Sequence, residues 1–193
     1  MYPNRNNELE VISLYRANYK ESRFYLRQIS RLAKLPLKTC QTALRNLEKE
    51  KVLKSKIEGK NKYFALNLDN IKAKSNLLQA EIYRTDIFLE SYPLIKTFLK
   101  SINTNIPIIV FGSFARLKAD RNSDLDLLIV AGEKQKLPYH LLPYKIHKVN
   151  ILESSFIKAI QQQETLIKEI EENHVILNNH SFYVNAMWEH YGK

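Results

Sequence analysis

The stretch IIVFGSFARLKADRNSDLDLLIV, residues 108–130, decides the fold of the second half of the chain. Its first apolar run ends in Gly112-Ser113, as a buried strand ends in a tight turn. Its second apolar run opens with Asp124 and Asp126, whose side chains share one face because strand residues alternate. Two such carboxylates repel each other unless a cation lies between them, and Mg²⁺ is commonly held by carboxylates and substrate phosphates. Since the turn can offer backbone N–H groups to phosphates, the stretch predicts nucleotide chemistry.

Charge is distributed unevenly along the 193 residues, whose formal net charge is +10. Residues 1–74 carry 17 Lys and Arg against 7 Asp and Glu, whereas residues 75–193 carry 13 of each kind. This asymmetry predicts two domains, the first of which faces a polyanion. A lysine-rich solvated surface would give the same charge, so the local pattern has to decide between the two interpretations.

Composition excludes several classes of protein. No apolar run approaches the length of a membrane span, and residues 1–5 lack the apolar core of a signal peptide, so we expect a cytoplasmic protein that does not contact a membrane. With Cys40 as the single cysteine, neither an intrachain disulfide nor a cysteine metal site can form, and we expect its side chain in the core. The five histidines lack the short spacing of a zinc site.

The basic first part has the pattern of three helices and a hairpin. Apolar residues recur at helical spacing in residues 8–18, 26–34 and 37–51, and Leu35-Pro36 separates the second helix from the third. Two short alternating runs around a glycine-containing turn follow in residues 52–66, which predicts a hairpin.

The phrase from Leu26 to Leu53 resembles the winged helix-turn-helix domain of transcription regulators, although the glycine often found where Lys51 stands is missing. The resemblance implies a double-stranded DNA partner, with the third helix in the major groove and the wing on phosphates. Contact with another protein, or dimerisation, is the alternative use of such a module. The candidate DNA-contacting residues are Lys38, Thr39, Gln41, Thr42 and Arg45 in the third helix and Lys56, Lys60 and Lys62 in the wing.

Residues 69–103 are expected to form a helical connector with one apolar side, capped by Asp69 and divided at Pro93. It would pack on the second domain and could also provide a homodimer surface. Beyond residue 130 we expect further strands and helices. The expected strands are 146–152 and 174–177, and the expected helices are one capped by Ser154 or Ser155, then 165–172 and 182–191.

The signature in residues 112–128, Gly-Ser-Phe-Ala-Arg, a polar run and Ser-Asp-Leu-Asp-Leu-Leu, resembles the nucleotidyltransferase superfamily that includes DNA polymerase β. The closer resemblance is to minimal nucleotidyltransferases, including archaeal proteins that join a winged helix to this domain, and it extends more weakly over residues 105–180. The resulting fold class is α+β. We expect a winged helix-turn-helix domain at 1–68, a helical linker at 69–104 and a nucleotidyltransferase fold with a small mixed sheet at 105–193.

The resemblance implies a role for each residue of the signature. Gly112 and Ser113 would hold the β- and γ-phosphates of an NTP, with ATP as the expected nucleotide, and Asp124 and Asp126 would bind Mg²⁺ or Mn²⁺ bridging the triphosphate. Arg116 would neutralise phosphate charge, together with Lys118 and Arg121, although all three could equally be solvated surface residues. Ser123 is expected to shape the turn.

The family places a third carboxylate on the next strand, often within Val-Asp-Leu. The matching position is Asn150, whose amide can bind a metal through its oxygen but supplies no negative charge and no base. Glu153 could substitute if the strand has already ended there. The catalytic half of the site is therefore expected to be incomplete, whereas its nucleotide-binding half is complete.

Three hypotheses follow. The first is an Mg²⁺-dependent enzyme that transfers an NMP, expected to be AMP, to a hydroxyl of a protein, RNA or small molecule. The second is a DNA-binding transcription regulator whose transferase-like domain senses a nucleotide or binds a partner without turnover. The third is an antitoxin acting on a small toxin-like protein partner, as family members of this size often do, although no residue here identifies such a partner.

Overall fold

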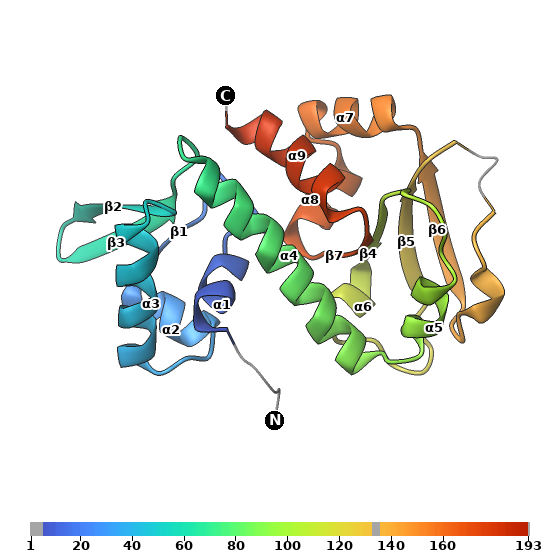
Figure 1. The fold of residues 1–193 in the computed structure, drawn as a ribbon, viewed down its shortest axis with the longest axis horizontal. Helices are drawn as coiled ribbons and strands as arrows, with labels where there is room; N and C mark the ends of the chain where they lie inside the picture. Colours follow the sequence, from blue (N-terminus) through green and yellow to red (C-terminus); the bar gives the residue numbers. More distant parts are fainter. Residues whose placement is uncertain (1–5, 133–135, 193) are drawn as a thin grey trace. The chain divides into compact units, whose positions relative to one another are not determined.

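The computed structural model describes residues 6–132 and 136–192 (Figure 1). Residues 1–5, where the sequence predicts no signal peptide, lie outside the described part of the chain. The chain divides into two compact units, Met1–Tyr83 together with Met187–Lys193, and Arg84–Ala186. Helices α4 (Ile71–Ser91) and α9 (His180–Tyr191) each contribute residues to both units.

The first unit contains the predicted helices and hairpin. The sheet is antiparallel, with β3 between β1 and β2. The first helix ends at Ser13, earlier than predicted, and Asn18 accepts hydrogen bonds from the backbone N–H groups of Lys20 and Glu21 in the turn that follows. The elements are α1 (Asn7–Ser13), β1 (Arg23–Tyr25), α2 (Leu26–Leu32), α3 (Leu37–Lys49), β2 (Leu53–Glu58) and β3 (Asn61–Leu66).

The core of the first unit is formed where α2, α3 and the hairpin meet. Ile29, Cys40, Leu44 and Leu53 are at most 2% exposed, so the prediction of a buried Cys40 is confirmed. Lys51, which follows α3, has a left-handed backbone with φ of +58°.

Two asparagine side chains support this left-handed residue. Asn67 and Asn70 each donate from Nδ2 to the carbonyl oxygen of Lys51 at 2.9 Å. Asn70 also caps α4, because its Oδ1 accepts from the backbone N–H of Lys72 at 3.1 Å. The prediction that Asp69 caps this helix is wrong, and its carboxylate lies 3.6 Å from Lys54 Nζ instead.

The second unit is built on a mixed four-stranded sheet in the order β6-β5-β4-β7 (Figure 1). Strand β5 is parallel to β6, and β4 is antiparallel to both β5 and β7. The predicted division of the helical segment at Pro93 is confirmed, because α4 ends and α5 begins on either side of it. The elements are α5 (Ile95–Lys100), β4 (Ile108–Phe111), α6 (Gly112–Ala115), β5 (Leu125–Val130), a 3-10 helix (Tyr139–Leu141), β6 (Ile146–Ile151), α7 (Glu153–Gln162), α8 (Thr165–Glu172) and β7 (Val175–Asn178).

Alternation along β5 separates an apolar face from a polar position. Leu125, Leu127 and Ile129 are buried in a hydrophobic cluster that includes Phe98 and Phe114. The residues between them point to the other face, which is how the fold places a carboxylate on a strand whose neighbours are buried.

Glu48 links α3 to the hairpin. Its carboxylate accepts hydrogen bonds from Lys62 Nζ at 2.8 Å and from the Ser55 hydroxyl. These two donors, Lys62 first, hold the pKa of Glu48 below its ordinary value. A carboxylate whose pKa is lowered by folding stabilises the folded state above its unfolded pKa, and this contribution is lost as the pH falls through its folded value.

We therefore expect Glu48→Gln to be less stable than the wild type at about pH 7, with the difference shrinking below about pH 4.3. Urea unfolding at several pH values measures this difference. Glu50→Gln is the control, because the exposed Glu50–Lys72 pair at 3.6 Å should contribute little at any pH. A Glu48→Gln difference independent of pH would contradict the prediction.

Candidate functional site

The turn after β4 is packed directly against a carboxylate of β5. Gly112 has φ of +67°, and a Cβ atom at this position would lie 2.3 Å from Asp126 Oδ2. The register of the antiparallel pair β4 and β5 places Phe111 opposite Asp126 and so fixes this approach. Glycine is therefore required twice, for its backbone conformation and for the space its missing side chain leaves.

Two basic side chains from the β6 segment face the carboxylate pair. Lys145 Nζ lies 2.8 Å from Asp124 Oδ2, and His147 Nδ1 forms a hydrogen bond of 3.0 Å with Asp126 Oδ1. The side chains of Asp124 and Asp126 are 35% and 25% exposed, so solvent and ligands can reach both. Each carboxylate thus has one basic neighbour from the adjacent segment.

The polar run between the two strands forms its own turn. The backbone N–H of Asp120 donates to Ser123 Oγ at 2.9 Å, and that hydroxyl donates to Asp120 Oδ1 at 3.0 Å. The backbone N–H of Asn122, followed by the Ser123 hydroxyl, holds the pKa of Asp120 below its ordinary value. Ser123 therefore shapes this turn.

The cationic residues of the signature lie on its surface. Arg116 is held beside the glycine turn, since its Nε donates to the carbonyl oxygen of Gly112 at 3.2 Å and its guanidinium lies 3.9 Å from Glu169. Lys118 and Arg121 are exposed. Ser113 is half-buried in the first turn of α6.

Asn150 and Glu153 are not brought to the carboxylate pair. In the parallel ladder Asn150 is the partner of Ile129, so it belongs to the face that carries the hydrophobic cluster. Strand β6 has ended before Glu153, which is exposed in the first turn of α7. The prediction that Ser154 or Ser155 caps this helix is wrong, because the helix starts immediately after Leu152.

His147 is the residue that the sequence analysis missed. It is the register partner of Asp126 in the parallel ladder and lies on the same sheet face. The available signal was strand parity, since His147 and Asn150 are an odd number of positions apart and cannot share a face. Choosing between them required the register of β6 against β5, which the sequence does not specify.

The site can hold a divalent cation only through a small set of oxygens. Within residues 6–132 and 136–192, no group of three or more His, Cys, Asp and Glu side chains comes together to bind a metal. The Asp124 and Asp126 carboxylates nevertheless fit a hard cation, because they are partly exposed and a side-chain ammonium already lies 2.8 Å from one of them.

The candidate DNA-contacting residues lie on α3 and the hairpin of the first unit. All are exposed except Thr39, which is half-buried. Lys62 is engaged by Glu48 at 2.8 Å, and Lys56 lies 3.7 Å from Glu58. The positive charges of these two ammonium groups are thus partly neutralised by carboxylates of the first unit.

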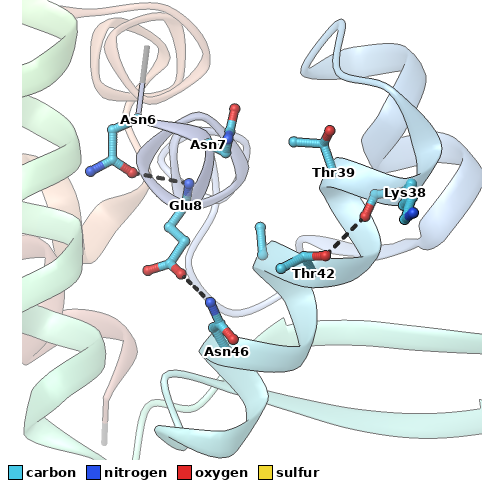
Figure 2. A pocket seen from close by; sticks show the side chains of 8 residues that line it. Asn6, Asn7, Glu8, Lys38, Thr39, Thr42 and Asn46 are labelled. Carbon is cyan, nitrogen blue, oxygen red and sulfur yellow. Dashed lines mark hydrogen bonds between the residues drawn. The ribbon is translucent and has the colours of Figure 1, made fainter. Parts of the chain in front are cut away.

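A pocket flanks α3 on each side. The first pocket is lined mainly by polar residues of α1 and α3 (Figure 2). In it, Glu8 accepts a hydrogen bond from Asn46 Nδ2 at 2.8 Å, and Thr42 Oγ1 donates to the carbonyl oxygen of Lys38. The second pocket lies between α3 and the hairpin, and its lining includes Gln41, Arg45, Lys60 and Lys62. The exposed ridge of α3 therefore stands between two grooves, the first lined mainly by polar residues and the second by both polar and apolar ones.

Comparison with known families identifies one part of the chain. Residues 93–178 match the family described as "Nucleotidyltransferase domain" and therefore form such a domain. The matched segment includes the glycine turn, the carboxylate pair and the whole of the mixed sheet, and leaves the helices and small antiparallel sheet of the first unit outside. No curated protein and no solved structure matches significantly. In the described part of the chain, no helix is both long and apolar enough to span a membrane.

The close approach of Gly112 to Asp126 can be tested by comparing two glycines with the same backbone conformation. Gly59 in the hairpin has φ of +59° and no atom within 4 Å of an added Cβ. Gly59→Ala should therefore lower the free energy of unfolding only by the cost of placing alanine in a left-handed backbone, about 1–2 kcal/mol. Gly112→Ala should lower the free energy of unfolding by a larger amount, because the added methyl group also displaces Asp126. Urea unfolding of both variants measures the difference, and equal losses would contradict the assigned contact.

Proposed function

We propose that the protein is a DNA-binding regulator whose nucleotidyltransferase domain binds an NTP, with ATP as the expected nucleotide, together with Mg²⁺ or Mn²⁺. The observation that carries the proposal is the packing of the Gly112 turn on Asp126. It brings backbone N–H groups suited to phosphates next to carboxylates suited to a hard cation. A metal-bound triphosphate needs both on one surface.

The residues divide the binding between them. Asp124 and Asp126 would hold the divalent cation, and Gly112 and Ser113 would hold the β- and γ-phosphates through backbone N–H groups and the hydroxyl. When bound, the cation supplies neutralisation of phosphate charge. Arg116, oriented by the Gly112 carbonyl oxygen, adds a positive charge beside the same turn.

The first unit supports the DNA-binding part of the proposal. Its element order and its charge agree with a winged helix, and the exposed ridge of α3 between the two grooves carries Lys38, Gln41, Thr42 and Arg45. A helix that enters the major groove lies between two phosphate backbones, and side chains that project from its ridge reach base edges. Lys56, Lys60 and Lys62 would contact phosphates from the hairpin.

Nucleotidyl transfer is the second candidate function, and the family match over residues 93–178 favours it. The transferred group would be an NMP, expected to be AMP, and the acceptor a hydroxyl of a protein, RNA or small molecule. Positioning and charge neutralisation carry most of the catalysis in such reactions. An antitoxin role would use the same domain on a toxin-like protein partner.

Nucleotide binding is tested by removing one carboxylate. We expect Asp126→Asn to weaken Mg²⁺-dependent binding of a non-hydrolysable ATP analogue by at least about tenfold, since a cation ligand is lost. Isothermal titration calorimetry with and without Mg²⁺ measures this affinity. Asp86→Asn, which removes an exposed carboxylate of α4, should bind as the wild type does. Equal affinities for Asp126→Asn and the wild type would refute the proposed site.

DNA binding is tested on a duplex taken from the upstream region of the protein's own gene. We expect the affinity to fall as salt rises, because phosphate contacts release counterions. Arg45→Ala should weaken binding by about 1–3 kcal/mol, as expected for an arginine that contacts a base. Lys100→Ala, an exposed cation of α5, is the charge control. Salt-independent binding, or none at low salt, would argue against a DNA partner.

A further inference from the structure

We infer that His147 takes the position beside Asp126 at which a second divalent cation would need a ligand, so that the site binds one cation with its nucleotide and not two. This inference rests on the proposed nucleotide-binding function and specifies it further. Its basis is the register of the sheet together with the charges that surround the carboxylate pair.

The register determines which residue of β6 can serve the site. Strand β6 runs parallel to β5, and His147 is the direct partner of Asp126. The 3.0 Å hydrogen bond between them shows that the imidazole points at the carboxylate. Asn150, in contrast, is the partner of the buried Ile129 and lies on the opposite face.

The charge balance limits how many cations the site can hold. Two divalent ions in one site lie about 3.5–4 Å apart and act as a symmetric clamp, so they must share ligands. Here the shared ligands are two carboxylates, while the imidazole of His147 supplies no negative charge. Lys145 adds a positive charge 2.8 Å from Asp124. Two divalent ions and the Lys145 ammonium would bring five positive charges to two protein carboxylates, so a second ion would depend on the phosphate oxygens of the nucleotide and would find no third carboxylate beside it among the described residues.

Side-chain mobility allows that one ion to bind. The side chain of Lys145 is 81% exposed and that of His147 is 63% exposed, so neither is fixed by core packing. Lys145 can move into solvent when a divalent cation takes its place. Substitution of His147 likewise removes no buried contact, which makes it a suitable position for a test.

The experiment counts the Mn²⁺ ions bound per chain in the presence of α,β-methylene-ATP, by equilibrium dialysis with electron paramagnetic resonance detection. The variants are wild type, His147→Asp and Asn150→Asp. Wild type should bind about one ion, His147→Asp about two, and Asn150→Asp about one, because of the two substituted positions residue 147 faces the pair and residue 150 does not. Asn150→Asp is the matched control, since it adds the same carboxylate three positions away on the other face of the strand.

The outcomes separate the inference from the function on which it rests. Two ions bound to the wild type would overturn the inference and leave nucleotide binding intact. A second ion in Asn150→Asp, or none gained in a folded His147→Asp, would overturn the assignment of residue 147. Failure of the wild type to bind the analogue at all would refute the proposed function itself. The wild-type count decides the inference even if a variant does not fold, which circular dichroism reveals.

Discussion

The contact on which the site depends is the approach of the Gly112 backbone to the Asp126 carboxylate. It requires a glycine, because the backbone at residue 112 is left-handed and a side chain there would overlap the carboxylate. It also requires the register of the buried antiparallel pair β4 and β5, which places Asp126 opposite Phe111, the residue before the glycine. The hydrophobic cluster beneath Leu125, Leu127 and Ile129 keeps β5 in place. Core packing around β4 and β5 thus fixes the position of the Asp126 carboxylate.

The charges of the two units suit different ligands. The first unit carries the chain's excess of lysine and arginine, and some of these cations are paired within the fold, as Lys62 is with Glu48. In the second unit each aspartate of the pair has a basic partner from the segment of β6. A ligand at either surface therefore competes with groups already present, so its net binding energy is smaller than the new contacts alone suggest.

Local patterns explain what the sequence predicted well, and long-range pairing explains what it missed. The turn at Gly112, the strand after Asp124, the hairpin and the buried Cys40 depend on neighbouring residues, and each was predicted correctly. The choice between His147 and Asn150 depends on how β6 pairs with β5, which short-range alternation cannot specify. At the start of α4 the sequence analysis chose Asp69 as the cap, whereas the neighbouring Asn70 accepts the hydrogen bond from the backbone N–H of Lys72.

Strand β6 lies at the edge of its sheet and pairs with a single neighbour. A strand with one neighbour is held by a single ladder of hydrogen bonds, so local opening of β6 would leave β4 and β5 paired with each other. Because Lys145 and His147 belong to this segment, such an opening would remove both of these side chains from the aspartate pair in one step. The electrostatic potential at the site therefore depends on the pairing of one edge strand.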